Sequence, residues 1–245
     1  MIAWRIRQLA ETVSANDDAK HAAEAGEPEG LVIWALRQTA GRGRRERKWE
    51  TGQGNLACSL LLRPAQAAKS YGAYSFVAAL SVRDVVSEKL KGLATTPPPV
   101  TLKWPNDVLV RGKKVSGIML EAGSDWLVVG VGVNVLNHPE NPAYPATSLR
   151  EEATVQEFRE PLNKILERLL DQFNHWATVL NVEGFAPIRA AWLEHAQKGP
   201  MTVKLGADIV KGDFRDLDET GALRLRLENG AERAISAGDV YFGAP

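Results

Sequence analysis

The chain changes character at Gly199-Pro200, and this change constrains the fold more than any other feature. Before it, apolar positions recur at helical spacing in some segments and fill short continuous runs in others, which is typical of helices mixed with buried strands. After it, short alternating segments are separated by turn sequences such as Asn229-Gly230. We therefore predict a larger domain over residues 1–198 and a small β-barrel over 199–245 that leans on it, because so few residues bury little core of their own.

The expected elements follow this division. In the first part, strands are expected over 1–13, 31–36, 55–63, 100–103, 107–111, 114–121 and 126–135, and helices over 17–25, 71–91 and 185–196, with a long helix whose apolar stripe runs from Phe158 to Trp176. Residues 136–153, rich in Pro, Asn and His, are expected to form a loop. In the second part, strands are expected over 202–205, 209–214, 223–227 and 233–235.

Composition excludes several classes of function. Thirty Lys and Arg residues balance thirty Asp and Glu residues, so no global field attracts nucleic acid or an anionic membrane. Cys58 is the only cysteine, which excludes an internal disulfide and a cysteine-rich zinc site. The N-terminus lacks a secretory signal, and no apolar run approaches the ~20 residues needed to cross a bilayer. We expect a cytoplasmic protein with neither a nucleic-acid nor a membrane partner.

One predicted strand–turn–strand concentrates polar chemistry. It carries two lysines, an amide, a carboxylate and a flexible glycine: Lys103, Asn106, Asp107, Lys114 and Gly117. Such a set can hold a phosphate-bearing ligand and a small ring in one cleft. The alternative is structural, with Lys114 a solvated hairpin lysine and Asp107 a plain turn residue.

A glycine-spaced basic run lies upstream at residues 38–49, with the sequence QTAGRGRRERKW. Five of the seven residues from 42 to 48 are basic, and Glu46 is the only acid among them. Guanidinium groups grip phosphate and carboxylate in a fixed fork and stay charged at physiological pH, so the run suits a polyanion such as a nucleotide triphosphate. A solvated basic loop is the alternative, but Trp49 and the apolar run Leu56–Leu62 favour a loop anchored between core strands.

With four further blocks, these two segments resemble biotin protein ligases along essentially the whole chain. The blocks occur in the family's order, at residues 14–16, 38–49, 54–56, 103–107, 114–121 and 130–134, and residues 221–223 and 236–240 resemble that family's C-terminal domain. The resemblance implies an α+β fold. Its catalytic domain would be similar to class II aminoacyl-tRNA synthetases, with a mixed sheet flanked by helices, followed by a small C-terminal SH3-like β-barrel.

The resemblance also implies a two-step reaction. Biotin's carboxylate attacks the α-phosphate of ATP, giving biotinyl-5′-AMP and pyrophosphate, and a lysine amine of a biotin carboxyl carrier domain then displaces AMP. Neither step needs a protein nucleophile, so the enzyme positions the reactants and neutralises charge on phosphate oxygens. ATP with Mg²⁺ would be the cofactors, the carrier domain of acetyl-CoA carboxylase or a related carboxylase the partner, and a homodimer is compatible with the family.

Residue roles follow from the matching motifs. Biotin binding is expected at Ser14, Ala15, Asn16, Gln38, Gly41, Arg42, Gly43, Arg44, Lys114 and Gly117, and ATP binding at Arg44, Arg47, Lys103, Asn106, Lys114 and Asn134. The expected catalytic residues are Lys114, Arg44 and Asp107. No metal site is expected from protein groups alone; Mg²⁺ would arrive with ATP near Asp107, which could instead orient the incoming lysine amine or accept its proton.

Some residues have structural alternatives, and two depart from the family pattern. Ser14 and Asn16 could serve only as helix caps, and Trp49, Trp104 and Cys58 are expected in the core. Ala15 stands where threonine is usual, and Glu46 where glycine is usual. Both changes bear on affinity more than on reaction class.

Three rival functions stay open. A lipoate–protein ligase or octanoyltransferase shares the scaffold, but the transferase needs a thiol nucleophile and a lipoate site an apolar slot. A biotin-sensing regulator would carry a helix-turn-helix domain, for which motifs beginning at Ser14 leave no room. A non-catalytic biotin binder is suggested by Ala15 and Glu46, whereas intact Lys114, Arg42 and Arg44 weigh against it.

Overall fold

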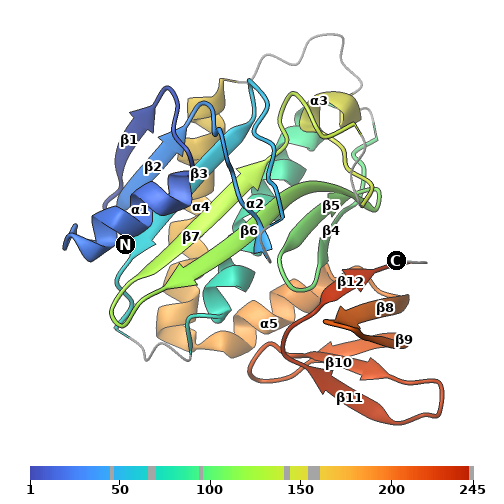
Figure 1. Cartoon of the computed structure of the whole chain (residues 1–245). Coiled ribbons are helices and arrows are strands. Elements are labelled where there is room, and N and C mark those ends of the chain that lie inside the picture. Colours follow the sequence, from blue (N-terminus) through green and yellow to red (C-terminus); the bar gives the residue numbers. More distant parts are fainter. Residues whose placement is uncertain (45–46, 66–69, 94–95, 141–143, 154–160, 243–245) are drawn as a thin grey trace.

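The computed structural model describes the chain except for residues 45–46, 66–69, 94–95, 141–143, 154–160 and 243–245. The strands of its first part are β1 (Arg5–Leu9), β2 (Leu31–Ala35), β3 (Leu56–Leu62), β4 (Val100–Lys103), β5 (Asp107–Val110), β6 (Lys113–Ala122) and β7 (Leu127–Val133). They form one seven-stranded sheet in the order β1-β2-β3-β7-β6-β5-β4 (Figure 1). β1 runs parallel to β2, and the other neighbouring pairs are antiparallel.

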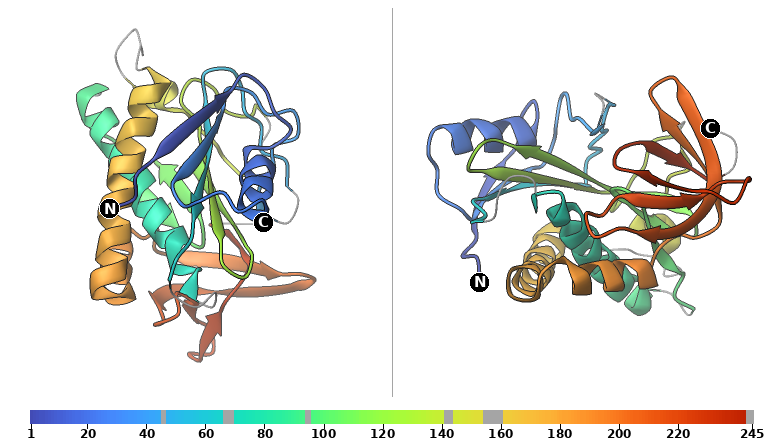
Figure 2. Two further views of the ribbon diagram at one scale, coloured as in Figure 1. Left: turned by 90° about the vertical axis from the view of Figure 1, so that its left-hand side faces the viewer. Right: turned by 90° about the horizontal axis from the view of Figure 1, so that it is seen from below.

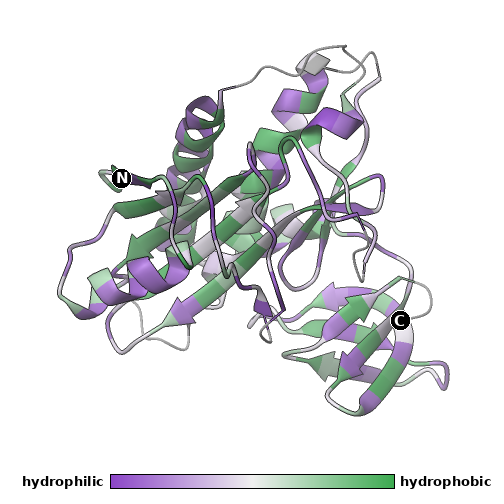
Figure 3. Cartoon of the chain, turned by 45° about the horizontal axis from the view of Figure 1, so that its top comes forward, coloured by the Kyte–Doolittle hydropathy of each residue, from purple (hydrophilic) through white to green (hydrophobic). Residues whose placement is uncertain are grey.

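Helices cover both faces of this sheet (Figure 2). The helices are α1 (Ala15–Glu24), α2 (Ala73–Leu93), α3 (Leu149–Glu152), α4 (Leu162–Glu183) and α5 (Phe185–Glu194). α2 and α4 lie on one face and α1 on the other, so β2, β3 and β7 are buried along their whole length and read as continuous apolar runs. Figure 3 shows these central strands as mostly hydrophobic, whereas α1 carries many hydrophilic residues.

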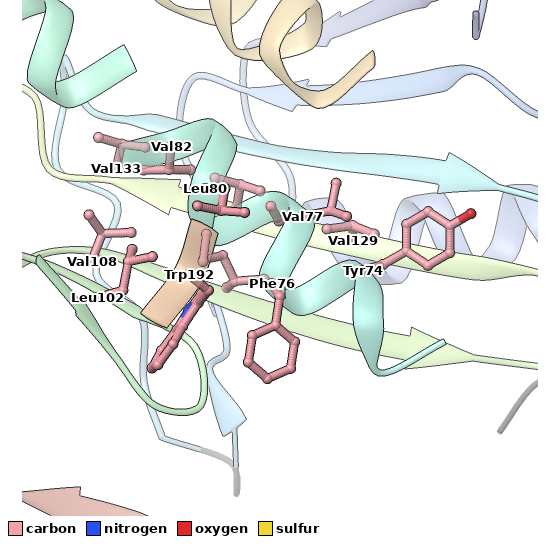
Figure 4. Packing of buried hydrophobic residues seen from close by; sticks show 14 of the residues in the cluster. Tyr74, Phe76, Val77, Leu80, Val82, Leu102, Val108, Val129, Val133 and Trp192 are labelled. Atoms are coloured by element: carbon pink, nitrogen blue, oxygen red, sulfur yellow. The ribbon is translucent and has the colours of Figure 1, made fainter. Parts of the chain in front are cut away.

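The main core lies between α2 and the sheet. Val77 and Leu80 of α2 belong to the same cluster as Val129 and Val133 of β7, and Trp192 of α5 joins it (Figure 4). All five of these side chains are buried. Removing them from water supplies the main driving force for this layer, at about 1.5–3 kcal/mol for each fully buried large apolar side chain.

A smaller core lies under α1 on the opposite face. Three buried alanines of the helix, Ala15, Ala19 and Ala23, pack with Ile33 of β2 and Leu61 of β3. Their small side chains let the helix approach the sheet closely, so the start of α1 lies directly against the strands. The candidate site is built on this face.

Residues 200–241 form a five-stranded antiparallel sheet. Its strands are β8 (Pro200–Leu205), β9 (Asp208–Leu217), β10 (Leu223–Arg226), β11 (Glu232–Ile235) and β12 (Asp239–Tyr241), in the order β11-β10-β9-β8-β12. This part leans on the first one as predicted: Trp104 donates its indole N–H to the carbonyl of Gly221 at 2.9 Å, and Phe214 packs beside Trp192. Phe76 lies so close to Gly221 that a β-carbon there would come within 2.7 Å of its ring.

The predicted fold class is confirmed, namely a mixed sheet flanked by helices with a small C-terminal β domain of the SH3-like type. Two elements were missed. α3 lies inside the expected loop 136–153 as a single turn, capped by the Ser148 hydroxyl that accepts from the Glu151 amide at 3.2 Å. β12 is only three residues long and depends on pairing with β8, so it has too little alternation to be seen in sequence.

Phe158, the expected start of the long apolar stripe, lies outside the described residues. Within the described part of the chain, no helix combines the length and the apolar character needed to span a membrane.

Candidate active site

A cavity of about 450 Å³ opens on the α1 face of the sheet. Its walls come from the start of α1, the loop that joins β2 to β3, the turn between β4 and β5, strands β6 and β7, the loop after β7, and β12 of the C-terminal domain. All but one of the predicted site residues line it: Ser14, Ala15, Asn16, Gln38, Arg42, Gly43, Arg44, Arg47, Lys103, Asn106, Asp107, Lys114, Gly117 and Asn134.

The floor of the cavity is a patch of small residues on adjacent strands. Ala57 of β3, Gly132 of β7 and Gly117 of β6 lie side by side in register. Next to them, Ser59 of β3 is paired with Gly130 of β7. The missing β-carbons matter here: one at Gly130 would overlap the Asn16 side chain, and one at Gly132 would overlap the Trp49 indole.

Two carboxamides form one polar end of the cavity. Gln38 accepts from the backbone N–H of Ala15 at 2.8 Å and donates to the Thr51 hydroxyl at 2.8 Å. Asn16 is buried and is also bonded through both ends of its amide. Ser14 occupies the N-cap position of α1, but its side chain makes no capping hydrogen bond. The interpretation of Ser14 and Asn16 as simple helix caps is therefore not supported for either side chain.

The opposite end of the cavity holds a compact group of charges. The two carboxylate oxygens of Asp107 contact different lysines, with Lys114 Nζ at 2.6 Å and Lys103 Nζ at 2.9 Å. Lys103 also donates to the carbonyl of Val240 at 3.2 Å and lies 3.8 Å from the centre of the Tyr144 ring. The alternative of a solvated hairpin lysine is thus wrong for Lys114, whose amine is bound to a buried carboxylate.

Burial and charge act against each other in this group. Burial alone would raise the pKa of Asp107, but the ammonium groups of Lys114 and Lys103 lower it to about 2. Burial lowers the pKa of Lys103, and the attraction of Asp107 opposes that effect. Asp107 is therefore ionised at neutral pH and serves as the internal counter-ion of two amines.

The described residues of the basic loop, 41–44 and 47–48, lie over the cavity and are tied to three different elements. Arg42 pairs with Asp17 of α1, Arg44 donates to the Asn106 side chain at 3.4 Å, and Arg47 pairs with Asp239 of β12. The loop is closed on itself by a backbone hydrogen bond from Gly43 N to Arg47 O of 2.7 Å. Arg45 and Glu46, including the departure noted at Glu46, lie outside the described residues.

Asn134 stands beside the charged end with an unused acceptor. Its Nδ2 donates to the carbonyl of Thr147 at 3.0 Å, while Oδ1 is buried and has no partner among the described residues. A buried oxygen without a donor costs free energy, which a ligand N–H in the cavity would offset.

Comparison with known proteins identifies the family. Residues 10–134 match the model of the biotin/lipoate A/B protein ligase family, and residues 200–243 match the biotin protein ligase C terminal domain. A biotin–[acetyl-CoA-carboxylase] ligase of Paracoccus denitrificans is 38% identical, covering 96% of this chain and 99% of that protein. The chain belongs to the biotin/lipoate A/B protein ligase family.

Other members of the biotin/lipoate ligase family agree in sequence and structure. A biotin–[acetyl-CoA-carboxylase] ligase of Mycobacterium tuberculosis is 37% identical, covering 97% of this chain and 89% of that protein. The biotin protein ligase of Aquifex aeolicus, solved in complex with biotin and ATP, superposes with a TM-score of 0.82 at 28% identity, and the match covers 97% of each chain.

Against this family background, two sequence interpretations need correction. Gly41 does not line the cavity; a β-carbon there would come within 2.6 Å of the Trp49 carbonyl oxygen and 2.8 Å of Gln38 Nε2, so it makes room for neighbouring protein atoms instead. Trp49 is not a core residue: its half-buried indole forms a cavity wall against Gly117 and Gly132. The large side chain of Trp49 and the basic loop beside it had suggested a core anchor. Its contact with Gly117 and Gly132 could not be predicted, because these glycines lie about 70 to 80 residues away in sequence.

Two other interpretations are confirmed. Trp104 and Cys58 are buried, as expected of core side chains. Burial raises the pKa of the Cys58 thiol to about 12, so it cannot supply the thiolate that an octanoyltransferase requires.

Several residues of the ligase site were not singled out from the sequence. They are Thr51, Ser59, Tyr144, Asp239 and Tyr241, which line the cavity or hold residues that do. Asp239 lies in the stretch 236–240 that resembles the family's C-terminal domain, but nothing there indicated a role in the site; only positions in the folded chain reveal it and the other four.

Proposed function

We propose that this protein is an ATP-dependent biotin–protein ligase. It activates biotin as biotinyl-5′-AMP with release of pyrophosphate, then transfers the biotinyl group to a lysine of a biotin carboxyl carrier domain, releasing AMP. One observation carries the proposal: Arg44 and Lys114 line the same cavity as Asn16 and Gln38, whose side chains are amides. The cavity volume of about 450 Å³ is in the range of small-molecule and cofactor sites.

The amide end is proposed to hold the ureido ring of biotin. A cyclic urea carries two N–H donors and one carbonyl acceptor, and in a buried site each of these needs a partner. Ser14, Asn16 and Gln38 supply hydroxyl and amide groups of both kinds, and the small floor at Gly117 gives the fused rings space. Ala15 lacks the hydroxyl usual at its position, a loss of about 1 kcal/mol of binding free energy for one hydrogen bond.

The charged end is proposed to hold the phosphates. Lys114 would contact the biotin carboxylate and the α-phosphate, where negative charge builds up as pyrophosphate leaves. Arg44 and Arg47, from the loop over the cavity, would also contact the phosphates. Lys103, whose side chain is more buried than that of Lys114, would contact the outer phosphates. Arg42 and Gly43 would complete the cover over biotin, while Asn134 would accept from the nucleotide base through its unpartnered oxygen.

Asp107 is proposed to orient amines rather than to accept a proton. A carboxylate whose pKa is about 2 is a weak base at neutral pH, whereas its two short contacts to ammonium groups suit it to hold a third amine, that of the carrier lysine.

Mg²⁺ is proposed to arrive with ATP. The described residues include no group of three or more His, Cys, Asp or Glu side chains that could hold a metal ion. Magnesium in nucleotide sites commonly needs only one or two protein oxygens besides phosphates, and Asp107 and Asn106 could supply these. The metal would neutralise phosphate charge.

Other features of the proposal concern organisation. The division into a catalytic domain (1–198) and a C-terminal domain (199–245) is supported by the two separate family matches at 10–134 and 200–243. A homodimer and the choice of carrier protein stay predictions from the resemblance, and a cytoplasmic location stays a prediction from the composition and the N-terminal sequence.

The test compares two neighbouring lysines. Lys114→Ala should lower biotin-dependent ATP–pyrophosphate exchange, and transfer of labelled biotin to a purified carrier domain, by roughly 100-fold or more, as for loss of one transition-state charge contact. Lys113→Ala is the matched control, because Lys113 pairs instead with the exposed Glu151, and should stay within about twofold.

Undiminished transfer by Lys114→Ala would reject the assignment of this lysine. Exchange supported by lipoate but not by biotin in the wild-type protein would reject the choice of acid.

A further inference from the structure

The Asn16 side chain is held in one orientation by two polar groups behind it. Its Nδ2 donates to the carboxylate of Glu121, near the end of β6, at 2.9 Å. Its Oδ1 accepts from the Ser59 hydroxyl of β3 at 2.5 Å. Because a carboxylate can only accept, turning the amide over would place Oδ1 against the Glu121 oxygens and lose that bond, whereas the Ser59 hydroxyl could rotate to accept from Nδ2.

The strand beneath is shaped for this arrangement. Gly130 of β7 lies in register with Ser59 and has no side chain, and a β-carbon at this position would overlap Asn16 Oδ1. Asn16 therefore lies flat on the sheet, 8% exposed, at the start of α1. Four elements, α1, β3, β6 and β7, thus fix one side chain.

The fixed amide keeps binding capacity for a ligand. A primary amide has two N–H donors and two acceptor lone pairs, so one of each is left after the bonds to Glu121 and Ser59. Asn16 lines the cavity, whereas Glu121 is not among the residues that line it. The bond to the Glu121 carboxylate is the stronger of the two restraints on the amide, because a hydrogen bond to a carboxylate is charge-assisted.

We propose that Glu121, with Ser59, is a positioning residue for ligand recognition. It does not touch the substrate; it holds the Asn16 amide so that its spare donor and acceptor meet the polar ring of the acid. This inference rests on the proposed function and names the residue that gives the neutral end of the site its fixed geometry.

The experiment measures KM for biotin, KM for ATP and kcat in biotin-dependent ATP–pyrophosphate exchange with the full chain. Glu121→Ala should raise KM for biotin roughly tenfold, the usual effect of losing a hydrogen bond to a charged group, with KM for ATP and kcat changed less than about twofold. Glu121→Gln keeps an oxygen that can accept from Asn16 and should raise it only about threefold. Asp125→Ala, an exposed carboxylate in the same hairpin, is the matched control and should have no effect on KM for biotin.

A double-mutant cycle separates positioning from a general structural role. If Glu121 acts through Asn16, adding Glu121→Ala to Asn16→Ala should change KM for biotin no further. Effects that add, or an unchanged KM for biotin in Glu121→Ala, would overturn the proposal.

If Glu121→Ala does not fold, as judged by its thermal transition, Ser59→Ala removes the second restraint with little change in volume. It should raise KM for biotin about threefold and be non-additive with Asn16→Ala; an unchanged or additive result would count against the proposal. A wild-type protein that shows no biotin-dependent exchange would instead reject the proposed function, before any variant is compared.

Discussion

The two ends of the cavity prepare for their ligands in different ways. At the amide end, Asn16 and Gln38 are neutral groups, each bonded through both sides of its amide to protein partners. At the charged end, the ligand-facing groups are full charges, and Asp107 compensates Lys103 and Lys114 internally.

This difference follows from what each end must bind. A neutral ring is recognised by donors and acceptors whose directions are already set, since little Coulomb attraction is available to pull it into place. Phosphates are themselves charged and attract cationic side chains. Before the anion binds, those side chains form ion pairs with Asp107, Asp17 and Asp239, and they can exchange these carboxylates for phosphate oxygens when it binds. The side-chain amides of the amide end thus keep their protein partners when a ligand binds, whereas the side chains of the charged end exchange protein carboxylates for ligand phosphates.

Removing the internal counter-ion should have the largest effect on stability. Asp107→Asn should lower the free energy of unfolding by about 2 kcal/mol at pH 7, because the pKa of Asp107 is lowered from 3.8 to about 2 in the folded chain. A lowered folded-state pKa means that this contribution is full above pH ~4 and is lost as the pH falls from 3.8 towards 2. Urea unfolding between pH 2 and 7 should show this acid limb in the wild type and a flatter one in the variant.

Glu232→Gln, which breaks an exposed pair with Arg224, is the control for that measurement and should change stability by less than about 0.5 kcal/mol. An unchanged acid limb in Asp107→Asn would show that the two lysines do not depend on this carboxylate.

Adding a β-carbon to the floor of the cavity should weaken ligand binding at the amide end alone. Gly130→Ala would displace the Asn16 amide, so KM for biotin should rise roughly tenfold while KM for ATP stays within about twofold. Gly92→Ala in α2 is the matched control, since a β-carbon there meets nothing within 4 Å. Steady-state pyrophosphate exchange at varied biotin and varied ATP checks both values, and an equal rise in the two KM values would contradict the separation of the ends.

A change in ionic strength should give the smallest of these differences between the two ends of the cavity. Raising the ionic strength from about 0.05 M to 0.5 M shortens the Debye length from roughly 14 Å to 4 Å, so KM for ATP should rise several-fold. KM for biotin should change less than about twofold, because biotin brings a single carboxylate to Lys114, whereas ATP brings several phosphate charges, and the hydrogen bonds to the biotin ring from neutral buried amides are screened little. A biotin KM as salt-dependent as the ATP KM would mean that charge dominates both ends.

Much of the fold could be predicted from local patterns. The helix over 71–91 and the strands over 55–63 and 126–135 have strong periodicity or continuous apolar runs, and each corresponds to α2, β3 or β7 within a few residues. α3 and β12 could not be predicted, because one turn and three residues carry no periodic signal. α3 forms because Ser148 caps it, and β12 forms because it pairs with β8.

The candidate site was predicted where residues carry charge or lie in glycine-rich motifs. Lys103, Asp107 and Lys114 were identified by residue type and spacing, and the structure brings the amine of each lysine within 3 Å of an Asp107 carboxylate oxygen. Ser59 and Glu121 were not assigned a role, because a serine in an apolar strand and a glutamate near a strand end have many ordinary functions.

The sequence by itself determined most of the helices and strands, α3 and β12 excepted, and which residue types would gather around a phosphate-bearing ligand, since both follow from local spacing and side-chain chemistry. Only the tertiary structure decided which partner each group takes. Arg47 meets Asp239, 192 positions away, and Lys103 meets the carbonyl of Val240, 137 positions away. Hydrogen bonds and ion pairs act over a few ångströms in space, and separation along the chain carries no information about that distance until the strands are placed side by side.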